Sequence, residues 1–451
     1  MSRQLHLTSG SIMPQLLGLA LPLLGANVLQ QLYNIANSLV ITWYAGERSL
    51  AALGIAESVM NLYIYVITGA CMGAGVLVAQ FYGEQNFVRL RRQLYVSAVL
   101  IGGSVLAAVL LGQLFLPQIL TLIQTPDEVR GEVSGYLRII LVGMVFTFAY
   151  NYLAASLRSI GDTRAALGFL FLSLGYNLAA AWVLVAVLDL GIMGAALATA
   201  TAQMFSAALC FLYIRKKRAF LLFSREDMVM ERPLIRLTIS YCAVAALQQS
   251  SLYLGKLMIQ GAVNGISAVS TAAISAFTAA GRVENFTQAF GLSGCEAMAI
   301  FIAQNHGAGE DRRALKGFLM GSSLTIGIGV FFSAGMGLFA QPVACLFLGG
   351  GEGMAPCVSY LQLISWFYIL SFFGNSFVGW FRGTGRMNIT FFGTTLQIVI
   401  RVIGSYLLVD AMGLDAVALS TGLGWMAIVL FQITVFLLQV RGNRLQPPHM
   451  V

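Results

Sequence analysis

The chain has 451 residues, of which 58% are hydrophobic and only 10% are charged. A soluble domain carries about 25% charged residues and cannot hide this much apolar surface in its interior. The composition therefore excludes a large water-soluble protein and predicts a polytopic helical membrane protein.

The segment before the first apolar stretch, MSRQLHLTSGSIMPQ, is polar and has no small-residue cleavage site. We therefore expect a short cytoplasmic tail rather than a signal peptide. Apolar segments of about 20 residues or more then predict membrane spans, and there are twelve of them. In chain order they lie at about 14–43, 49–80, 92–117, 134–157, 165–188, 192–214, 235–262, 267–304, 317–340, 357–381, 388–410 and 414–439.

The basic residues orient these spans. With the N-terminus inside the cell, 20 of the 26 Lys and Arg residues fall in cytoplasmic segments, 3 fall on the opposite side, and 3 fall within spans. This asymmetry follows the positive-inside rule. It predicts that both termini are cytoplasmic in a plasma (cell) membrane. The net charge of +8 is then a consequence of topology and predicts no nucleic-acid partner.

The chain also repeats itself. GVLVAQFYG at 75–83 resembles AIFIAQNHG at 299–307, and YLRIILVGMVFTFAYNYLAASLRSIGDTR at 136–164 resembles YLQLISWFYILSFFGNSFVGWFRGTGRMN at 360–388. Both matches keep one constant spacing, which pairs Gln80 with Gln304 and Gly161 with Gly385, and the spacing is slightly shorter nearer the two ends of the repeat. Six spans per copy is an even number, which predicts parallel repeats. We expect two six-helix lobes, 1–217 and 233–451, joined by a cytoplasmic linker at 218–232.

Several motifs resemble the multidrug and toxic compound extrusion (MATE) family over nearly the whole chain. They are LALPLLGANVLQQLYNIANSLVITWYAG in the first span, TPDEV, YNYLAASLRSIGDTR, GIMGAALAT and IAQNHGAGEDRRA. The resemblance implies an all-α protein whose two lobes form a V-shaped cleft. It also implies export of small organic compounds in exchange for Na⁺ or H⁺, with a lipid bilayer and a coupling cation as partners.

The chain departs from the coupling sites of that family. Where one branch has an aspartate in the first span, this sequence has Asn37, and where the fifth span of that branch has an aspartate, this sequence has Ala181. The neighbouring Asn151, Asn177 and Thr199 match that site. A neutral amide takes up no proton at physiological pH and offers Na⁺ an oxygen without charge.

The other branch of the family uses a glutamate in span 7 and an aspartate in span 10. Here span 7 has Gln248 and Gln249 nearby, and span 10 has no carboxylate. The resemblance therefore leaves the coupling ion open between H⁺ and Na⁺. No cofactor or metal is implied beyond this transported ion.

Six ionisable residues remain within the predicted spans and away from their ends, and a charge at bilayer depth usually finds a partner in the protein. They are Glu57, Lys256, Arg282, Glu284, Glu296 and Arg401. The helical spacing of Lys256 with neighbouring polar residues suggests an inward face. We predict that Lys256 pairs with Glu284, with Arg401 as a third member.

Polar stripes at helical spacing add further candidates. The ion-coupling candidates are Glu284, Lys256, Arg401, Asn37, Asn177, Asn151 and Thr199, and the substrate-binding candidates are Gln31, Asn34, Glu57, Asn61, Gln249, Tyr253, Gln260, Arg282 and Gln288. Three interpretations of the charged cluster compete. It is a paired network that fixes helix register, a site that exchanges a proton in each cycle, or a contact for an anionic or zwitterionic group on the cargo.

These patterns favour a secondary active exporter, a multidrug antiporter, that is monomeric and moves cationic or amphiphilic compounds by alternating access. The alternative within transport is a flippase or exporter of lipid-linked or anionic amphiphilic cargo. A membrane-embedded enzyme is disfavoured because the acidic residues are scattered and the three histidines are peripheral, so the sequence has no nucleophile, base or metal constellation.

Overall fold

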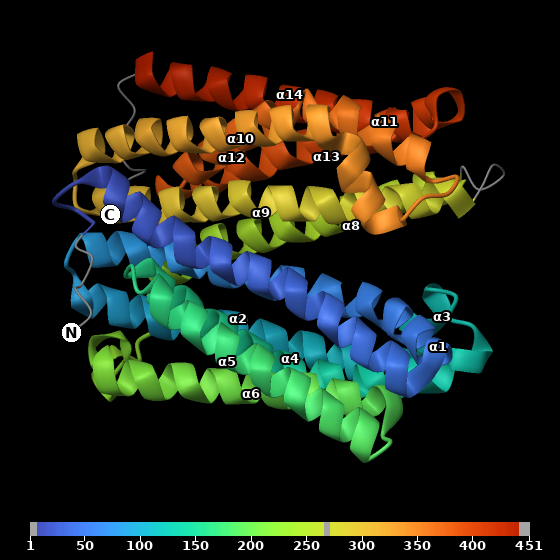
Figure 1. The fold of residues 1–451 in the computed structure, drawn as a ribbon. Helices are drawn as coiled ribbons and strands as arrows, with labels where there is room; N and C mark the ends of the chain where they lie inside the picture. Colours follow the sequence, from blue (N-terminus) through green and yellow to red (C-terminus); the bar gives the residue numbers. More distant parts are fainter. Residues whose placement is uncertain (1–6, 266–270, 442–451) are drawn as a thin grey trace. The chain divides into compact units, whose positions relative to one another are not determined.

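The structure is a computed structural model that describes residues 7–265 and 271–441; the side chains of 34–43, 45–48, 50, 51, 271, 440 and 441 lie outside the description. The described residues form helices joined by short turns (Figure 1). In chain order the elements are α1 (Ile12–Gly83), α2 (Phe87–Leu114), α3 (Leu116–Leu122), α4 (Asp127–Ser159), α5 (Thr163–Ala181), η1 (Trp182–Val187), α6 (Gly191–Lys217), η2 (Ala219–Leu221), η3 (Arg225–Asp227), α7 (Arg232–Thr238), η4 (Ile239–Ala243), α8 (Val244–Gly265), α9 (Thr271–Gly307), α10 (Asp311–Leu348), α11 (Met354–Ser365), α12 (Tyr368–Gly383), α13 (Met387–Met412) and α14 (Leu414–Arg441).

The predicted spans agree with these helices closely. Helix α1 covers both of the first two predicted spans, and its two apolar stretches, Ile12–Tyr33 and Ala52–Gly83, are each long enough to cross a membrane. Within the described residues, 10 helices are long and apolar enough to span, or up to 11 when α11 and α12 are taken as one broken span. The all-α, multi-span prediction is confirmed.

The predicted span at 235–262 is the one that is not counted. Its residues are helical without interruption from Arg232 to Gly265, through α7, the π-helical turn η4, and α8. Polar side chains, including Gln248, Gln249 and Lys256, lower its mean apolarity. This segment is long enough to span but carries the polar face expected of a helix that lines a protein interior.

The chain divides into two compact units. Unit 1 contains Gly25–Ser250, and unit 2 contains Leu7–Leu24 together with the described part of Ser251–Val451. The division by packing thus places the first turns of α1 with unit 2, and α7 and η4 with unit 1. The lobe boundaries drawn from the sequence repeat and the charge pattern differ from these limits and remain a prediction.

In unit 1, α4 packs against both α2 and α6, and α5 packs against α6 (Figure 1). The second half of α1 contacts η4 and α8 at backbone distance. A Cβ atom built on Gly69 would lie 2.6 Å from the carbonyl oxygen of Ala245, and one on Gly73 would lie 2.6 Å from that of Tyr241. Glycines spaced four apart allow this close approach between helices, as in other membrane proteins.

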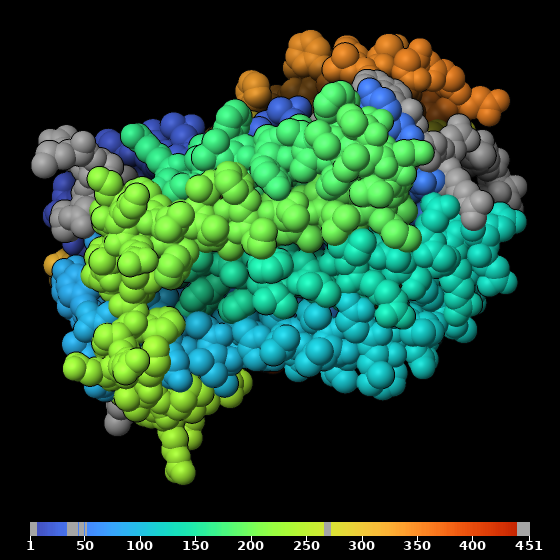
Figure 2. All heavy atoms as spheres, turned by 90° about the horizontal axis from the view of Figure 1, so that it is seen from below, coloured from blue at the N-terminus to red at the C-terminus, as the bar shows by residue number. Residues whose placement is uncertain are grey.

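The predicted linker is an ordered part of unit 1. Asp227 accepts a 2.8 Å hydrogen bond from the Arg91 guanidinium, and Glu231 pairs with Arg92. Phe220 stacks on Tyr82 with 6.0 Å between ring centroids. Figure 2 shows the yellow-green linker against the light-blue beginning of α2. The linker is therefore held against the end of the unit 1 bundle by these contacts, which we call the clasp.

In unit 2, α9 packs against α10 and α12, and α13 packs against α14. Helix α10 is kinked at Phe339, three residues before Pro342, because proline removes a helical hydrogen bond and crowds the preceding turn. Helices α11 and α12 meet at a bend of 53°. The bend brings the buried Tyr360 and Tyr368 into one core with Ile364 and Trp425.

The sequence repeat has a counterpart in backbone geometry. Gly161 and Gly385, predicted to be equivalent, both adopt positive φ, at +85° and +77°, where they end α4 and α12. Gln85 and Gly309, which the same spacing makes equivalent, adopt φ of 58° and 76°. A left-handed residue at these four places turns the chain between consecutive spans in the same way. Each half is therefore built on one plan.

Candidate functional site

A carboxylate and a guanidinium meet inside unit 2. Glu284 lies on α9 and Arg401 on α13, and their closest atoms, Oε2 and Nη2, are 4.0 Å apart. Their side chains are only 13% and 18% exposed, respectively. Tyr360 on α11 donates a hydrogen bond of 3.3 Å to the same Glu284 oxygen. The charge on Glu284 is thus compensated from two sides, as a charge within a membrane span requires.

The predicted partner of Glu284 is wrong. Lys256 is exposed, and it forms no ion pair in the part of the chain that the structure describes. The cation expected as a third member, Arg401, takes its place. Lys256 lies on an exposed face of α8, so the spacing of its polar stripe does not bring the ammonium to Glu284. Arg282 is also exposed, and it points away from Glu284 as its spacing of two residues predicted.

One turn along α9, a second polar contact extends this site. The Ser371 hydroxyl on α12 donates a 3.0 Å hydrogen bond to Gln288 Oε1. The Gln288 amide nitrogen is buried and has no hydrogen-bond partner among the described residues. A buried unpaired donor costs free energy. Unit 2 therefore has an ion pair with a donor beside it that is available to a ligand oxygen or a water molecule.

The predicted site formed by Asn151, Asn177 and Thr199, called the amide site below, lies inside unit 1. Asn177 on α5 is 4% exposed, and its amide nitrogen lies 3.4 Å from the Thr199 hydroxyl on α6. Its Oδ1 is buried without a hydrogen-bond partner among the described residues. Asn151 donates to the carbonyl of Thr147 in its own helix at 2.8 Å. The structure thus brings Asn177 and Thr199 together, with a neutral oxygen left over.

The two sites occupy equivalent places in the repeat. The Tyr136 hydroxyl lies 3.7 Å from Met60 Sδ, and the Tyr360 hydroxyl lies 3.3 Å from Glu284 Oε2. Each contact joins residues 76 apart, and the spacing of the repeat carries the first contact onto the second. The same spacing relates Asn177 to Arg401. Unit 2 therefore carries its charges where unit 1 carries a thioether and an amide.

Glu57 lies half-buried on α1 in unit 1. It lies near Tyr33, which is hydrogen-bonded to Thr199. Tyr136 lies near both Tyr33 and Glu57. Glu57 therefore belongs to the same polar interior of unit 1 as the amide site, and it forms no ion pair with the residues that the structure describes.

The other predicted contacts belong to both units. Gln31, Asn61 and Gln249 are half-buried in unit 1, Tyr253 is buried in unit 2, and Gln260 donates to the Asn264 side chain at 2.9 Å. The side chains of Asn34 and Asn37 lie outside the described residues. The set is thus divided between the two units, and its role in cargo binding stays a prediction.

Sequence reasoning missed the tyrosines. Tyr360 contacts Glu284 directly, and Tyr33 links Thr199 to Glu57. A signal for Tyr360 was present, because the repeat pairs it with Tyr136 and an identical residue kept in two diverged halves has a shared task. No comparable signal identified Tyr33, because Thr199 and Tyr136 approach it from helices distant in sequence.

Comparison with protein families identifies a match to each half of the chain. The family model described as MatE matches residues 22–183 and again residues 244–407. The starts of the two matched ranges are separated by the spacing found near the end of the repeat. Together the ranges cover more than half of the chain.

Among curated proteins, the chain is 28% identical over 364 residues to the probable multidrug resistance protein YoeA of Bacillus subtilis, covering 79% of this chain and 77% of that one. It is 24% identical to the probable multidrug resistance protein YpnP of the same organism, with 84% of each chain covered. A third relative, the probable multidrug resistance protein NorM of Thermotoga maritima, is 25% identical and covers 83% of this chain and 81% of its own.

Solved structures share the fold. A MOP superfamily transporter from Pyrococcus furiosus superposes with a TM-score of 0.89 at 20% identity and 99% coverage of both chains. That protein is described as having a binding pocket of reverse polarity, which suggests a different function for it. A multidrug resistance MATE transporter in an outward-facing conformation superposes with a TM-score of 0.86 at 21% identity, again with 99% coverage of both chains.

Proposed function

The chain belongs to the MatE family, whose members are multi-pass membrane transporters and not enzymes, and from this premise we propose that it is a proton-coupled exporter of small organic compounds. The cargo is cationic or amphiphilic, and the two lobes expose it alternately to the two sides of the plasma membrane. The observation that carries the proposal is the Glu284–Arg401 pair inside unit 2.

Glu284 is the proposed proton carrier. Its separation of 4.0 Å from Arg401 is longer than the roughly 2.7–2.9 Å of a charge-assisted hydrogen bond. We therefore propose that a proton on the Glu284 carboxylate can take the place of the attraction to Arg401. A proton taken up by the Glu284 carboxylate leaves a neutral acid beside a charged guanidinium, and loss of that proton restores the pair. This change of charge is the local event that would bias two conformations of the unit.

The same geometry disfavours Na⁺ as the coupling ion. Na⁺ would need several oxygen ligands, and the Arg401 guanidinium places a positive charge next to the one carboxylate available there. A proton needs only the carboxylate oxygen. In unit 1, Asn177 Oδ1 and Thr199 are neutral oxygens, which suit a hydrogen bond to cargo better than capture of a cation.

Flipping or export of lipid-linked or anionic amphiphilic cargo is a second candidate. It rests on one observation, which is that three cations, Arg401, Lys256 and Arg282, lie within the predicted spans of unit 2 against two acids, Glu284 and Glu296. Both candidates share the topology predicted from the basic residues, with cytoplasmic termini in a plasma membrane, and both treat the monomer as the working unit.

Transport by reconstituted protein tests the proposal. Proteoliposomes with an imposed pH gradient, and separately with a Na⁺ gradient, are assayed with a fluorescent cationic dye for the wild type and for Glu284→Gln. Glu296→Gln is the matched control, because it removes a half-buried carboxylate from the same helix, α9, that is not paired with Arg401.

We expect pH-driven dye movement that Glu284→Gln abolishes and Glu296→Gln keeps. Movement driven by Na⁺ alone would overturn the choice of ion. Undiminished pH-driven movement by folded Glu284→Gln would make the pair structural. Movement of an anionic amphiphile without movement of the dye would favour the second candidate.

A further inference from the structure

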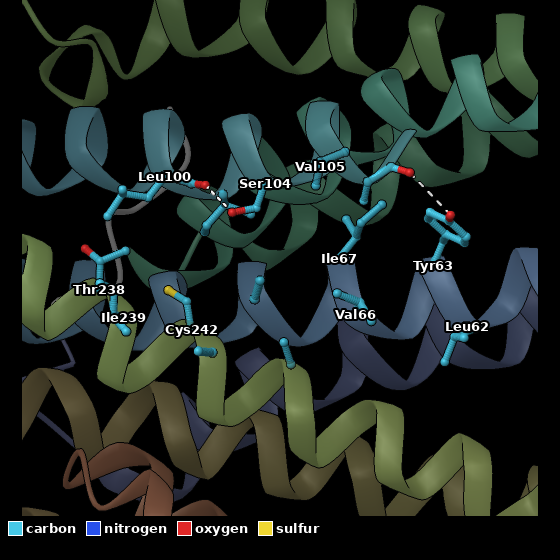
Figure 3. Close-up of a pocket in the computed structure, with 15 residues that line it drawn as sticks. Leu62, Tyr63, Val66, Ile67, Leu100, Ser104, Val105, Thr238, Ile239 and Cys242 are labelled. Carbon is cyan, nitrogen blue, oxygen red and sulfur yellow. Dashed lines mark hydrogen bonds between the residues drawn. The ribbon is translucent and has the colours of Figure 1, made fainter. Parts of the chain in front are cut away.

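Unit 1 contains an open apolar groove that the proposed transport cycle does not use. It has a volume of about 410 Å³ and lies between the second half of α1, helix α2, and the segment that joins α7 to α8 through η4. Its floor is buried, with Ile67 and Cys242 only 2% and 4% exposed, and its rim is open, with Ile239 55% exposed. Thr238 and Ile239 lie at one end and Tyr63 lies at the other (Figure 3).

The chemistry of the walls selects an apolar occupant. The three hydroxyl groups that line the groove are already used: Tyr63 donates to the Ala108 carbonyl at 3.3 Å, Ser104 to that of Leu100 at 2.8 Å, and Thr238 to that of Leu234 at 2.8 Å. The remaining lining is aliphatic apart from the buried Cys242 thiol. A polar cargo entering here would lose its hydrogen bonds to water and gain none, which is costly.

The length of the groove matches that of one lipid acyl chain in one leaflet of the bilayer. The stretch of α2 that lines the groove, from Leu100 to Ala108, rises about 12 Å. One leaflet of a bilayer has a hydrocarbon depth of about 15 Å. Small side chains, among them Ala70, Ala243 and Ala246, create the hollow. Gly69 and Gly73 close its back by holding α1 against η4 and α8.

The end of the groove near Thr238 is basic. Arg236 precedes Ile239 by three residues and therefore lies on the same helical face about one turn beyond the groove. It is exposed, and it has no carboxylate partner among the described residues. The nearby acids are engaged elsewhere, since Asp227 pairs with Arg91 and Glu231 with Arg92. The Arg236 guanidinium is thus available to an external anion.

We propose that this groove is a binding site for an anionic phospholipid, with one acyl chain between α1, α2 and η4 and the phosphate on Arg236. One lipid molecule can contact both the groove and the guanidinium, because Arg236 lies at the end of the groove. A basic residue near the membrane surface attracts anionic headgroups. Zwitterionic lipid with the same chains can fill the groove but gains less from the cation.

The experiment measures thermal unfolding of the detergent-purified full-length protein. Phosphatidylglycerol or phosphatidylcholine with identical acyl chains is added, and retained lipids are counted by native mass spectrometry. Ala243→Phe fills the groove from its exposed rim, and Ser104→Phe fills it from the α2 wall if the first variant does not fold. Ala107→Phe adds the same bulk to an exposed α2 position that does not line the groove.

The headgroup is tested by Arg236→Gln, and its control is Lys216→Gln, an exposed cation at the end of α6 in the same unit. We expect phosphatidylglycerol to raise the unfolding temperature of the wild type by at least about 2 °C more than phosphatidylcholine does. Arg236→Gln should remove this difference, the groove-filling variants should remove the shift from both lipids and the retained lipid, and both controls should keep them.

Three results would overturn the proposal. The first is an equal shift for both lipids in the wild type. The second is a phosphatidylglycerol-specific shift that survives in a folded groove-filling variant. The third is stabilisation by a lipophilic cation, lost in the groove-filling variants and accompanied by no lipid preference, which would make the groove a cargo site.

Discussion

Tyr360 donates its hydroxyl to Glu284 from a position that corresponds, in the other half of the chain, to the position from which Tyr136 meets Met60. The tyrosines are part of the shared plan, whereas the acid and its guanidinium partner are particular to unit 2. One copy of the repeated scaffold therefore carries a charge pair where the other copy holds neutral groups. This asymmetry makes the energetic role of the pair testable.

Removal of one member of the pair should destabilise the protein more than removal of both. Arg401→Gln leaves the Glu284 carboxylate with Tyr360 alone, and we expect a loss of about 1–3 kcal/mol in the free energy of unfolding, below the value for a fully buried pair because the side chains are partly exposed. The double variant Arg401→Gln with Glu284→Gln should recover part of that loss. Unfolding in mixed micelles by denaturant measures the cycle.

Lys256→Gln is the control for this cycle, because its ammonium is exposed and unpaired within the described residues. It should change stability little, alone or combined with Glu284→Gln. Additive losses from Arg401→Gln and Glu284→Gln, or a coupling of Glu284 to Lys256 instead, would contradict the pairing found here.

The contact between α1 and η4–α8 should tolerate no added atom. Gly69→Ala places a Cβ 2.6 Å from the Ala245 carbonyl oxygen, so the two backbones must separate. We expect a loss of at least about 1 kcal/mol from overpacking. Gly103→Ala, on α2 with no atom within 4 Å of the added Cβ, should instead be neutral or stabilising by about 0.5–1 kcal/mol. Thermal unfolding of the two variants distinguishes them, and equal effects would refute the contact.

The repeated left-handed turns give a prediction with opposite signs in the two halves. Gly309→Ala forces an alanine to φ of 76° and should cost about 1 kcal/mol. At the equivalent place, Gln85 already bears that strain at φ of 58°, so Gln85→Gly should be neutral or slightly stabilising. Unfolding midpoints of both variants test this, and a large loss for Gln85→Gly would show that its side chain matters more than its backbone.

The clasp formed by the linker should depend on pH through Asp227. Burial raises the pKa of this carboxyl, but hydrogen bonds from the Ser224 backbone, the Arg91 guanidinium and the Ser224 hydroxyl outweigh burial and lower the pKa below its ordinary value of 3.8. A depressed pKa in the folded state contributes stability that is present above the unfolded pKa and is lost as pH falls through the folded pKa.

Asp227→Asn should therefore lower the unfolding temperature at pH 7, and the difference from the wild type should shrink once pH falls below about 3.8. Asp189→Asn, which changes a carboxylate in the turn between η1 and α6, is the control. A difference between Asp227→Asn and wild type that stays constant from pH 7 to the acid limit would show that the charge on Asp227 does not hold the clasp.

Much of the architecture could be predicted because short stretches of sequence determine it. Each apolar run of about 20 residues predicts its own helix, and the repeat is visible in short motifs such as those ending at Gly161 and Gly385. The partner of Glu284 could not be predicted in this way. Three cations were available in the spans, and the choice among them depends on the rotation of α8 and α13 about their axes, which sequence spacing within one helix does not determine. The lipid groove depends likewise on small residues from segments far apart in the chain.

The order of the two charges along the chain has a consequence for biosynthesis. Arg401 follows Glu284 by roughly 120 residues, and at about 5–20 residues per second a ribosome needs roughly 6–24 s to make that stretch. During this interval the Glu284 carboxylate has been made and its guanidinium partner has not. Pairing is completed only when α13 has been inserted. A nascent chain that stalls earlier has the Glu284 carboxylate without its partner. Formation of the ion pair therefore distinguishes a chain that contains α13 from one that stops before it.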